Sequence, residues 1–227
     1  MDKNKEKADF DCVVVANGLF PEKEEVLAWL KVVPKIIACD GAARKLLVGG
    51  YHVDAIVGDL DSLPEELKRE YATFVHHSAE QMSNDLTKAM RFACKRGFRK
   101  VLILGATGLR EDHTLGNISL LTQYMDWFDK VEMRSDFGVF IPLKETTILP
   151  SAPGQQVSIF SITPQTEITA TGLRWEVKDR PFDCWWQGTL NESLEDEFTI
   201  AFSGDAKIVI YQAYIDNKKR KEECPVL

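Results

Sequence analysis

The feature that most constrains the fold is an alternation in the first 130 residues. Short, purely apolar runs alternate there with stretches of helical periodicity. The runs are CVVVA (12–16), IIAC (36–39), DAIV (54–57) and VLIL (101–104), with a shorter strand candidate, TFVHH, at 73–77. Helical patterns lie between them at 21–33, 42–48, 64–72 and 86–97, the last closed by Gly97. Strands that are apolar on both faces are typical of a parallel sheet covered by helices on both sides. We therefore predict an α/β domain.

The helical periodicity disappears after about residue 130. A series of short strand patterns, separated by turn residues, takes its place: VEMRS, FGVFIP, ETTILP, QQVSIFSI, TEITATG, EDEFTIAF and AKIVIYQAYI. Such a series is typical of an antiparallel sandwich or a small barrel. We expect an α/β domain over residues 10–133, a β-sandwich domain over 134–217, and charged tails at 1–9 and 218–227.

Composition narrows the classes of partner. Hydrophobic residues make up 44% of the chain, which suits a globular core, and 28 basic against 35 acidic residues give a net charge of −7. This balance argues against a polybasic nucleic-acid binder, and it means that an anionic substrate needs local cations or a metal ion. No apolar run approaches the roughly 20 residues of a membrane span. The start of the chain is charged and lacks an apolar signal region. We expect a cytoplasmic protein without a nucleic-acid or membrane partner.

The five cysteines are widely scattered, and none has the C-x-x-C spacing of a zinc or redox site. We interpret them as small buried hydrophobic residues in a reducing compartment.

Carboxylates follow several of the predicted strands. In an open parallel sheet, ligands bind beyond the carboxyl ends of the strands. Asp40 follows IIAC, Asp59 and Asp61 follow DAIV, and Asp85 opens the helix after TFVHH. If the segment of Asp59 and Asp61 is extended, both side chains point the same way and repel each other unless a cation lies between them. Such oxygen ligands suit Mg²⁺ held against phosphates, although a simple turn remains the alternative.

The loop Gly105–Asp112 after VLIL is a second candidate. Gly105 and Gly108 allow the backbone to approach a ligand, and Arg110 offers a planar fork to phosphate oxygens. Asp112 is expected to hold a metal ion or a hydroxyl group, and it or Thr114 to cap the next helix. The loop matches neither the Walker A nor the dinucleotide pattern, and an ordinary strand-to-helix loop is the alternative.

Other polar and aromatic residues are less specific. Asp85 and Lys88 share one helix face, either in a site or as a surface ion pair. His76 and His77 lack ligand spacing. Trp185 and Trp186 would face opposite sides of a strand, so that one of them meets a ligand or a partner chain. Packing in the core or at a dimer contact is the alternative for these rings.

Taken in order, several motifs resemble the thiamine pyrophosphokinase family over about residues 12–211. They are ACDGAARKLL, DAIVGDLDSLP, QMSNDLTKAM, LGATGLREDHTLGNISLL, GLRW and GTLNE. The resemblance implies a nucleotide-binding α/β domain followed by a thiamine-binding β-sandwich. It also implies a homodimer with thiamine bound between the subunits. The implied reaction transfers the diphosphate of ATP to the hydroxyl of thiamine, with Mg²⁺, and yields thiamine diphosphate and AMP.

The resemblance also implies roles for residues. Asp59, Asp61 and Asp85 would hold the metal and act in catalysis with Arg110 and Asp112. The nucleotide side would comprise Asp40, Gly41, Lys88, Gly105, Thr107, Gly108, Arg110, His113 and Asn117. The thiamine side would comprise Gln81, Asp85, Asn191 and Trp186, with Trp175 as the alternative ring. The sequence departs from the family pattern at Asn84, Leu109 and Leu190.

Three other interpretations remain open at this point. One is a Mg²⁺-dependent phosphohydrolase with Asp59 as nucleophile. Another is a nucleotide-sugar transferase that uses the Asp-x-Asp pair. The last is a non-catalytic regulator that binds a nucleotide or thiamine. Within the kinase interpretation, either Asp85 or Asp112 accepts the hydroxyl proton.

Overall fold

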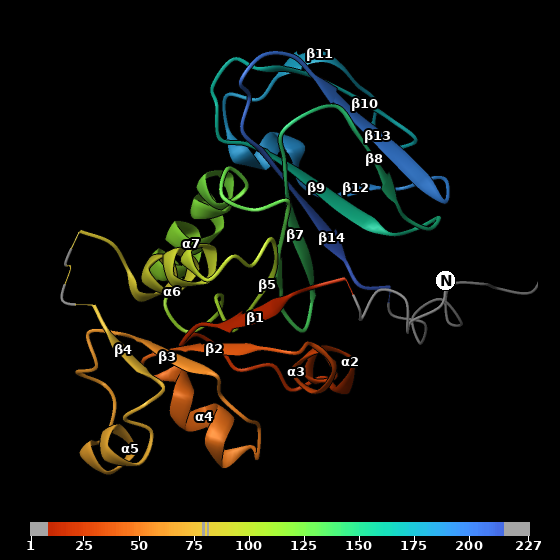
Figure 1. The fold of residues 1–227 in the computed structure, drawn as a ribbon. Helices are drawn as coiled ribbons and strands as arrows, with labels where there is room; N and C mark the ends of the chain where they lie inside the picture. Colours follow the sequence, from red (N-terminus) through yellow and green to blue (C-terminus); the bar gives the residue numbers. More distant parts are fainter. Residues whose placement is uncertain (1–8, 79, 81, 216–227) are drawn as a thin grey trace, which may run out of the picture. The chain divides into compact units, whose positions relative to one another are not determined.

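The structure is a computed structural model that describes residues 9–78, 80 and 82–215 (Figure 1). The chain divides into two compact units, Met1–Asp136 and Phe137–Leu227. The tails predicted at 1–9 and 218–227 lie outside the described residues, apart from Asp9. Within the described part of the chain, no helix is both long enough and apolar enough to cross a membrane.

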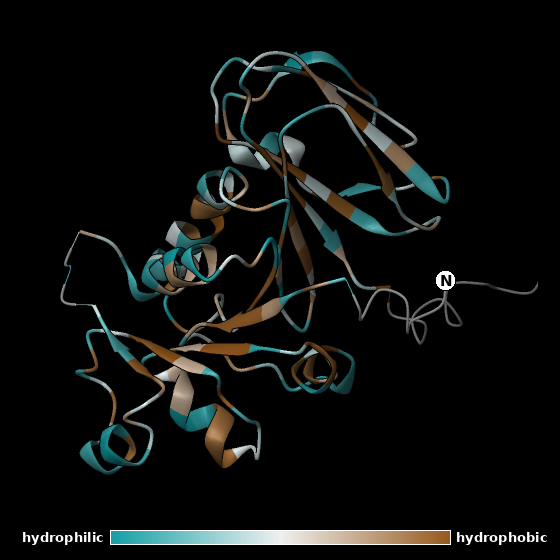
Figure 2. Ribbon diagram, viewed as in Figure 1, coloured by the Kyte–Doolittle hydropathy of each residue, from teal (hydrophilic) through white to brown (hydrophobic). Residues whose placement is uncertain are grey.

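The first unit contains a parallel sheet in the strand order β6-β5-β1-β2-β3-β4. Its strands are β1 (Cys12–Val15), β2 (Ile36–Cys39), β3 (Ala55–Gly58), β4 (Val75–His77), β5 (Lys100–Leu104) and β6 (Lys130–Arg134). All residues of β1, β2 and β3 are buried, and Figure 2 shows these strands in the colours of apolar residues. The strand order reverses between β1 and β5, which is where an open α/β sheet offers a ligand crevice.

Helices connect these strands. They are α2 (Glu24–Leu27), α3 (Trp29–Val32), α4 (Ala42–Val48), α5 (Glu65–Glu70), α6 (Asp85–Lys95) and α7 (Glu111–Tyr124). The single helix predicted at 21–33 is divided into α2 and α3, because the amide of Lys31 bonds to the carbonyl of Ala28 three residues back and tightens the turn. Helix α6 begins after Asn84, whose side chain accepts from the amide of Thr87. Gly97, with φ +84°, follows its end as predicted.

The second unit consists of two antiparallel sheets, in the orders β12-β9-β14-β7 and β11-β10-β13-β8. Its elements are β7 (Gly138–Leu143), β8 (Thr147–Pro150), β9 (Gln156–Ser161), β10 (Glu167–Thr171), β11 (Val177–Pro181), the 3₁₀ helix η1 (Trp185–Gly188), β12 (Asn191–Glu192), β13 (Glu197–Phe202) and β14 (Ile208–Ala213). Alternate residues of both sheets, such as Phe198 and Ile200 of β13 and Ile208 and Ile210 of β14, form one buried core. The predicted fold class, an α/β unit followed by an antiparallel β-sandwich, is confirmed.

Two local predictions are wrong. The segment VEMRS does not belong to the antiparallel strands, because β6 pairs in parallel with β5. Its central residue, Glu132, is buried and forms an ion pair with Arg134. Because Glu132 is polar, the sequence of this buried parallel strand alternates like that of a half-exposed strand. Trp185 and Trp186 lie in η1 rather than on a strand, so they do not occupy opposite faces of a strand as predicted.

Candidate active site

Three carboxylates from two neighbouring strand ends converge in the first unit. Asp40 follows β2 directly and Asp59 follows β3, with Asp61 two residues further on. Each of these three residues offers a carboxylate oxygen, and the three oxygens lie within 4.8 Å of one another. The segment between Asp59 and Asp61 is not extended as predicted. Leu60 has φ +67°, and the amide of Asp61 turns back to lie 3.4 Å from Asp59 Oδ1. A tight turn therefore brings the two side chains together.

Asp40 is the most buried of the three, with 1% of its surface exposed. Its Oδ2 accepts from the amide of Ser62 at 3.1 Å, whereas its buried Oδ1 has no hydrogen-bond partner among the described residues. Burial raises the pKa of Asp40 against the opposing effect of the Ser62 amide, and the charges of Asp85, Asp61 and Asp59 raise it further. A buried carboxylate oxygen without a donor, surrounded by like charges, is the environment that a divalent cation satisfies.

Asp85 lies beside this group but is engaged by Lys88. The Nζ of Lys88 lies 3.0 Å from Asp85 Oδ1 and 3.7 Å from Asp59 Oδ2, and the lysine side chain is 4% exposed. Burial lowers the pKa of Lys88, but the hydrogen bond and charge of Asp85 and the charge of Asp59 outweigh it, so the pKa is raised overall. Lys88 therefore stays charged and ties the start of α6 to the end of β3. The structure groups Asp40, and not Asp85, with Asp59 and Asp61.

Gly58, the last residue of β3, allows this close arrangement. A Cβ atom there would lie 2.8 Å from Asp40 Cβ and 3.5 Å from Asp85 Oδ1. The first distance is shorter than real Cβ contacts, so a larger residue would push the two acids apart.

The glycines of the loop between β5 and α7 pack against the loop that follows β1. Gly105 and Gly108 have φ of +64° and +73°. A Cβ on Gly105 would lie 2.6 Å from the carbonyl oxygen of Ala16, and one on Gly108 would lie 2.7 Å from Leu19 Cβ. The carbonyl of Thr107 accepts from the amide of Leu19 at 2.9 Å. The glycines thus let this loop pack on the loop after β1, and the two loops flank the switch point between β1 and β5.

The charged residues that follow this loop are exposed and paired with each other. Arg110 forms two bonds to Asp112, from Nη2 to Oδ2 at 2.6 Å and from Nε to Oδ1 at 3.1 Å. This bidentate contact, helped by the amide of His113, lowers the pKa of Asp112 to about 2. Helix α7 starts after Arg110 without a side-chain cap, so the cap expected from Asp112 or Thr114 is wrong, because Asp112 is bound by Arg110 instead.

Asn117 connects two parts of the predicted site. It is buried in α7, donates from Nδ2 to the carbonyl of Ala106 at 2.8 Å, and accepts from Nδ2 of Asn84 at 2.9 Å. It therefore links the loop after β5 to the start of α6, and does so without exposing its own amide to the crevice.

The loop after β1 was not among the segments predicted to form the site. Gly41 packs against the side chain of Asn17 so closely that a Cβ atom would clash with it, and Lys45 of α4 donates to the carbonyl of Gly18 at 2.8 Å. Burial lowers the pKa of Lys45, which forms no ion pair within the described residues. The rule that ligands bind beyond strand ends, applied also to the run CVVVA, identifies Asn17 and Gly18.

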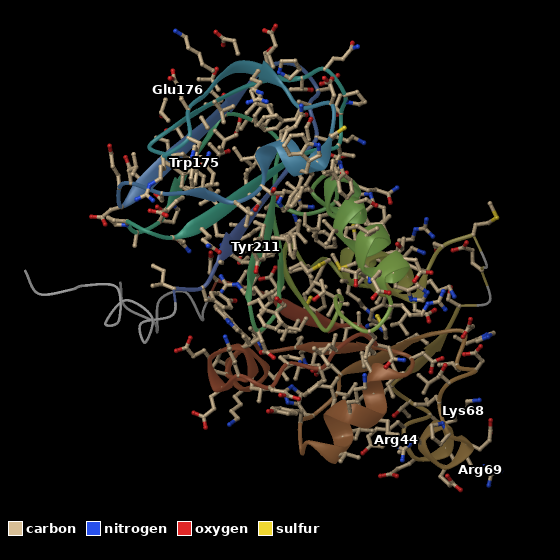
Figure 3. All side chains as sticks on the ribbon, turned by 180° about the vertical axis from the view of Figure 1, so that it is seen from behind. Arg44, Lys68, Arg69, Trp175, Glu176 and Tyr211 are labelled. Atoms are coloured by element: carbon tan, nitrogen blue, oxygen red, sulfur yellow. The ribbon has the colours of Figure 1, made fainter. Side chains whose placement is uncertain are left out.

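Of the residues predicted for thiamine, Asn191, Trp186 and the alternative ring Trp175 belong to the second unit, whereas Gln81 and Asp85 belong to the first. The Trp186 side chain is 72% exposed and that of Trp175, labelled in Figure 3, is 55% exposed. Asn191 is buried, where it accepts from the amide of Trp175 and donates to its carbonyl at 2.8 Å. It therefore holds the backbone of Trp175 in place. Gln81 lies outside the described residues.

Asp40, Asp59 and Asp61 form what we call the acidic cluster, and no cysteine or histidine of the described residues belongs to it. Cys12 and Cys39 are buried as expected, but Cys94 is half-buried and Cys184 is exposed, because it precedes the surface helix η1. Cys224 lies beyond the described part of the chain. His76 packs on Phe92 with ring centroids 4.5 Å apart.

Comparisons with known proteins indicate the family to which the chain belongs. Residues 27–133 match the family model for the thiamin pyrophosphokinase catalytic domain, and residues 138–211 match the model for its substrate-binding domain. The chain is 28% identical to thiamine pyrophosphokinase 1 of Oryza sativa subsp. japonica, over 87% of this chain and 84% of the relative.

Solved structures share the fold. Thiamin pyrophosphokinase from Candida albicans superposes with a TM-score of 0.75 at 17% identity, covering 90% of each chain. The enzyme from Geobacillus thermodenitrificans gives 0.71 at 23% identity, covering 91% of this chain and 98% of its own. The two family models together match most of the chain, in the order of its two units. The chain therefore belongs to the thiamin pyrophosphokinase family.

Proposed function

We propose an assignment of residues for the reaction of this family. The chain is a thiamine pyrophosphokinase, which transfers the diphosphate group of ATP to the hydroxyl of thiamine and yields thiamine diphosphate and AMP. The observation that carries our assignment is the unpartnered, buried Oδ1 of Asp40 beside Asp59 and Asp61.

Asp40, Asp59 and Asp61 are the proposed ligands of Mg²⁺, with Asp85 next to them. Their oxygens are hard ligands that suit this ion, and their mutual repulsion favours a cation among them. When bound, Mg²⁺ supplies positive charge that neutralises the phosphates. Lys88 contributes a fixed positive charge at the same edge, through its contacts with Asp85 and Asp59.

The nucleotide is proposed to lie against the loops at the switch point. The side chains of Arg110 and of its ion-pair partner Asp112 are both exposed, at 69% and 61%. The guanidinium of Arg110 is therefore accessible to phosphate oxygens. Gly105, Thr107, Gly108, His113 and Asn117 shape this side, together with Asp40 and Gly41. Beside Gly18, Lys45 adds a cation that has no acidic partner in the described part of the chain.

Asp85 is our choice for the group that accepts the proton of the thiamine hydroxyl. Asp112 is a weak acceptor, because Arg110 holds its pKa at about 2. Asp85 stands beside the acidic cluster, and its side chain is 38% exposed.

The thiamine ring is proposed to meet the second unit. The exposed face of Trp186, or of Trp175, suits a flat cationic ring, and Asn191 positions Trp175. Gln81 completes this side in the proposal. We propose that the enzyme is a homodimer, with thiamine bound between subunits, and that it acts in the cytoplasm. The four described cysteines are free, as expected in a reducing compartment.

A coupled assay of AMP release, with and without thiamine, tests the assignment. We expect release to require both thiamine and Mg²⁺, and Asp61→Asn to lower it by at least about 100-fold with an unchanged circular dichroism spectrum. Glu66→Gln, on the exposed surface of α5, is the matched control and should retain full activity. Near-normal transfer by Asp61→Asn would remove Asp61 from the metal site. Phosphate release without thiamine would favour a phosphohydrolase instead.

A further inference from the structure

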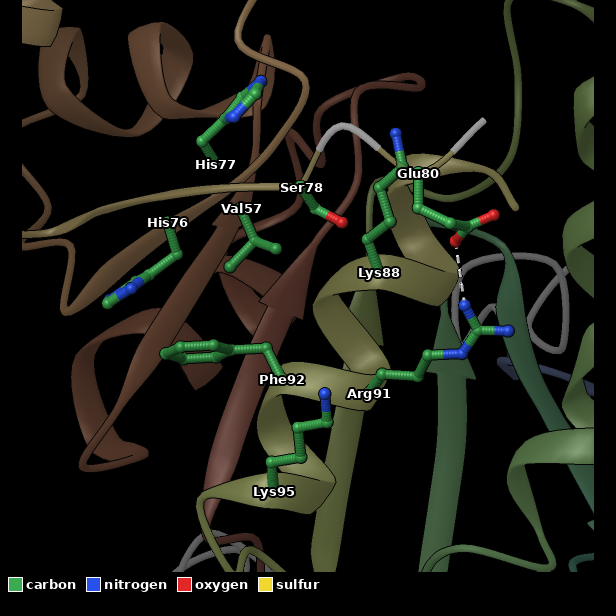
Figure 4. Close-up of a pocket in the computed structure, with 9 residues that line it drawn as sticks. All are labelled: Val57, His76, His77, Ser78, Glu80, Lys88, Arg91, Phe92 and Lys95. Atoms are coloured by element: carbon green, nitrogen blue, oxygen red, sulfur yellow. Dashed lines mark hydrogen bonds and ion pairs between the residues drawn. The ribbon is translucent and has the colours of Figure 1, made fainter. Parts of the chain in front are cut away.

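A pocket of about 360 Å³ lies in the first unit beside the acidic cluster (Figure 4). It is formed by the end of β3, by β4 with the residues that follow it, and by one side of α6. Asp40, Asp59, Asp61 and Asp85 do not line it. Its size falls within the range of roughly 300–1,000 Å³ that is usual for sites of small ligands.

The lining carries excess positive charge. Lys88, Arg91 and Lys95 project from successive turns of α6, whereas Glu80 is the one acid among the lining residues. Arg91 is paired with Glu80 at 3.0 Å, and Lys88 is paired with Asp85. Lys95 forms no ion pair with any described residue, and Figure 4 shows its ammonium group directed along the pocket beside Phe92. An anion in the pocket would therefore gain a charge partner without breaking an existing one.

The lining also offers hydrogen-bonding groups. Ser78 presents its hydroxyl group to the pocket. Glu80 uses Oε2 for Ser83 and Arg91, while its Oε1 is buried and has no hydrogen-bond partner in the described structure. Val57 and Phe92 provide apolar surface between these polar groups. Because Oε1 of Glu80 is covered by protein atoms and points away from Val57 and Phe92 in Figure 4, the pocket offers a ligand the hydroxyl of Ser78 rather than this oxygen.

We propose that this pocket binds a phosphate ester. Lys95 supplies the positive charge for its phosphate and Ser78 a hydroxyl donor, and Val57 and Phe92 offer apolar surface to the organic part of the ester. Both products of the family's reaction, AMP and thiamine diphosphate, have this chemistry, so either one is a source of the ligand. The binding itself does not depend on the roles proposed for the acidic cluster.

Histidine resonances provide a test that is independent of activity. The chain has four histidines, and two of them, His76 and His77, line the pocket. His52 pairs with Asp54, and His113 stands in α7 on the proposed nucleotide side. The imidazole signals in a proton NMR spectrum, assigned with His76→Gln and His77→Gln, therefore report separately on the pocket and on the proposed active site.

The full chain would be titrated at constant pH and ionic strength with inorganic phosphate, AMP, thiamine diphosphate and adenosine. We expect saturable shifts of the His76 and His77 signals with at least one of the two esters, and none with adenosine, which lacks the phosphate. If only AMP or only thiamine diphosphate shifts these signals, that compound is the source of the ligand. Inorganic phosphate should bind more weakly than the effective ester, because it lacks the organic group that packs on Val57 and Phe92.

Lys95→Gln should weaken the binding reported by His76 and His77 by ~5-fold or more and leave the response of His113 unchanged. Lys31→Gln, an exposed lysine in the last turn of α3, is the matched control and should bind like the unmodified chain. The proposal is overturned if neither ester moves the pocket histidines in a saturable way, or if Lys95→Gln binds as tightly as the unmodified chain. A response of His113 alone would leave the proposed active site intact and exclude the pocket.

Discussion

At the scale of single residues, Asp40 is the member of the acidic cluster whose charged form is most disfavoured by burial and by neighbouring charges. Its carboxylate is buried, receives one amide hydrogen bond, and faces the charges of Asp59, Asp61 and Asp85. Lys88 offsets part of this charge, but its Nζ contacts Asp85 and Asp59 rather than Asp40. The folded protein therefore holds Asp40 in its charged form at a cost to stability, unless a cation is bound.

Asp40→Asn should accordingly raise the melting temperature by a few degrees in the absence of Mg²⁺, because it removes a buried charge and keeps an acceptor for the Ser62 amide. The same variant should lose most of the stabilisation that Mg²⁺ gives to the unmodified chain. Thermal unfolding with and without Mg²⁺ measures both effects. An equal Mg²⁺-dependent stabilisation of the two proteins would contradict the metal assignment of Asp40.

Asp9 makes the opposite contribution. Hydrogen bonds from Lys100, at 2.6 Å, and from Lys130, at 2.9 Å, lower its pKa below the usual 3.8. A carboxylate with a lowered pKa in the folded state stabilises the protein above its unfolded pKa, and this contribution is lost as the pH falls below that value.

Asp9→Asn should therefore lower the melting temperature slightly at neutral pH. The loss in free energy of unfolding should be less than about 1 kcal/mol, because the Asp9 side chain is 40% exposed. The difference from the unmodified chain should shrink as the pH falls below 3.8, and it should vanish once the pH is below the lowered pKa of Asp9. Melting curves across this pH range test it, with Asp205→Asn, an exposed acid of the second unit, as control. A difference that persists unchanged in acid would show that charge is not its origin.

At the scale of elements, the site depends on how closely neighbouring strand ends approach each other. Glycine at the end of β3 lets Asp40 and Asp85 stand side by side, and glycines after β5 let one loop pack on the loop after β1. Asn117 then joins α7, the loop after β5 and the start of α6 through two hydrogen bonds. These contacts set the positions of the loops before any ligand is present.

Gly58→Ala isolates the first of these contacts. Its methyl group would lie 2.8 Å from Asp40 Cβ, so the strand end or Asp40 must move. We expect a loss of about 1–3 kcal/mol in stability and a fall in kcat of at least about 10-fold, with a weaker response to Mg²⁺. Gly116→Ala, where a Cβ atom meets nothing within 4 Å, is the matched control and should be neutral or stabilising. Normal kinetics in Gly58→Ala would show that the acids tolerate a wider spacing.

At the scale of the whole molecule, the chain separates its tasks between two units. The first contains the acidic cluster and the loops at the switch point, and the second exposes Trp175 and Trp186. The proposed homodimer would combine the first unit of one subunit with the second unit of its partner. If each site is shared in this way, two inactive variants with substitutions in different units should restore activity in mixed dimers, whereas sites formed within one subunit should not.

Equal amounts of Asp61→Asn and Trp186→Ala subunits, unfolded together and refolded, should regain about a quarter of the unmodified activity. Half of the randomly mixed dimers contain both variants, and each of these has one site with neither substitution. Activity of the refolded mixture, compared with each variant refolded alone, measures the rescue, and light scattering measures the dimer mass. If Trp175 is the stacking ring, Trp175→Ala takes the place of Trp186→Ala in the same experiment. Dimers without rescue by either pairing would place each site within one subunit.

Much of this molecule was predictable from local patterns. The bare apolar runs indicated buried parallel strands, because only a strand covered on both faces can be apolar at every position. The acids at the strand ends were identified by the same rule, and so was the position of Asn84 before α6. Failures came where a local pattern had two readings. A buried, paired Glu132 made β6 resemble a half-exposed strand, and the turn at Leu60 replaced an extended segment.

The sequence by itself determined the order of strands and helices, the two-part organisation and the chemical character of the site, because these depend on periodicity and on residue types along the chain. Only the tertiary structure decided which acids meet. Asp40 and Asp59 are 19 positions apart, and their separation in space depends on strand pairing, on the missing side chain of Gly58 and on the Lys88 contacts that engage Asp85. Long-range packing sets such distances, and no local pattern in the chain encodes them.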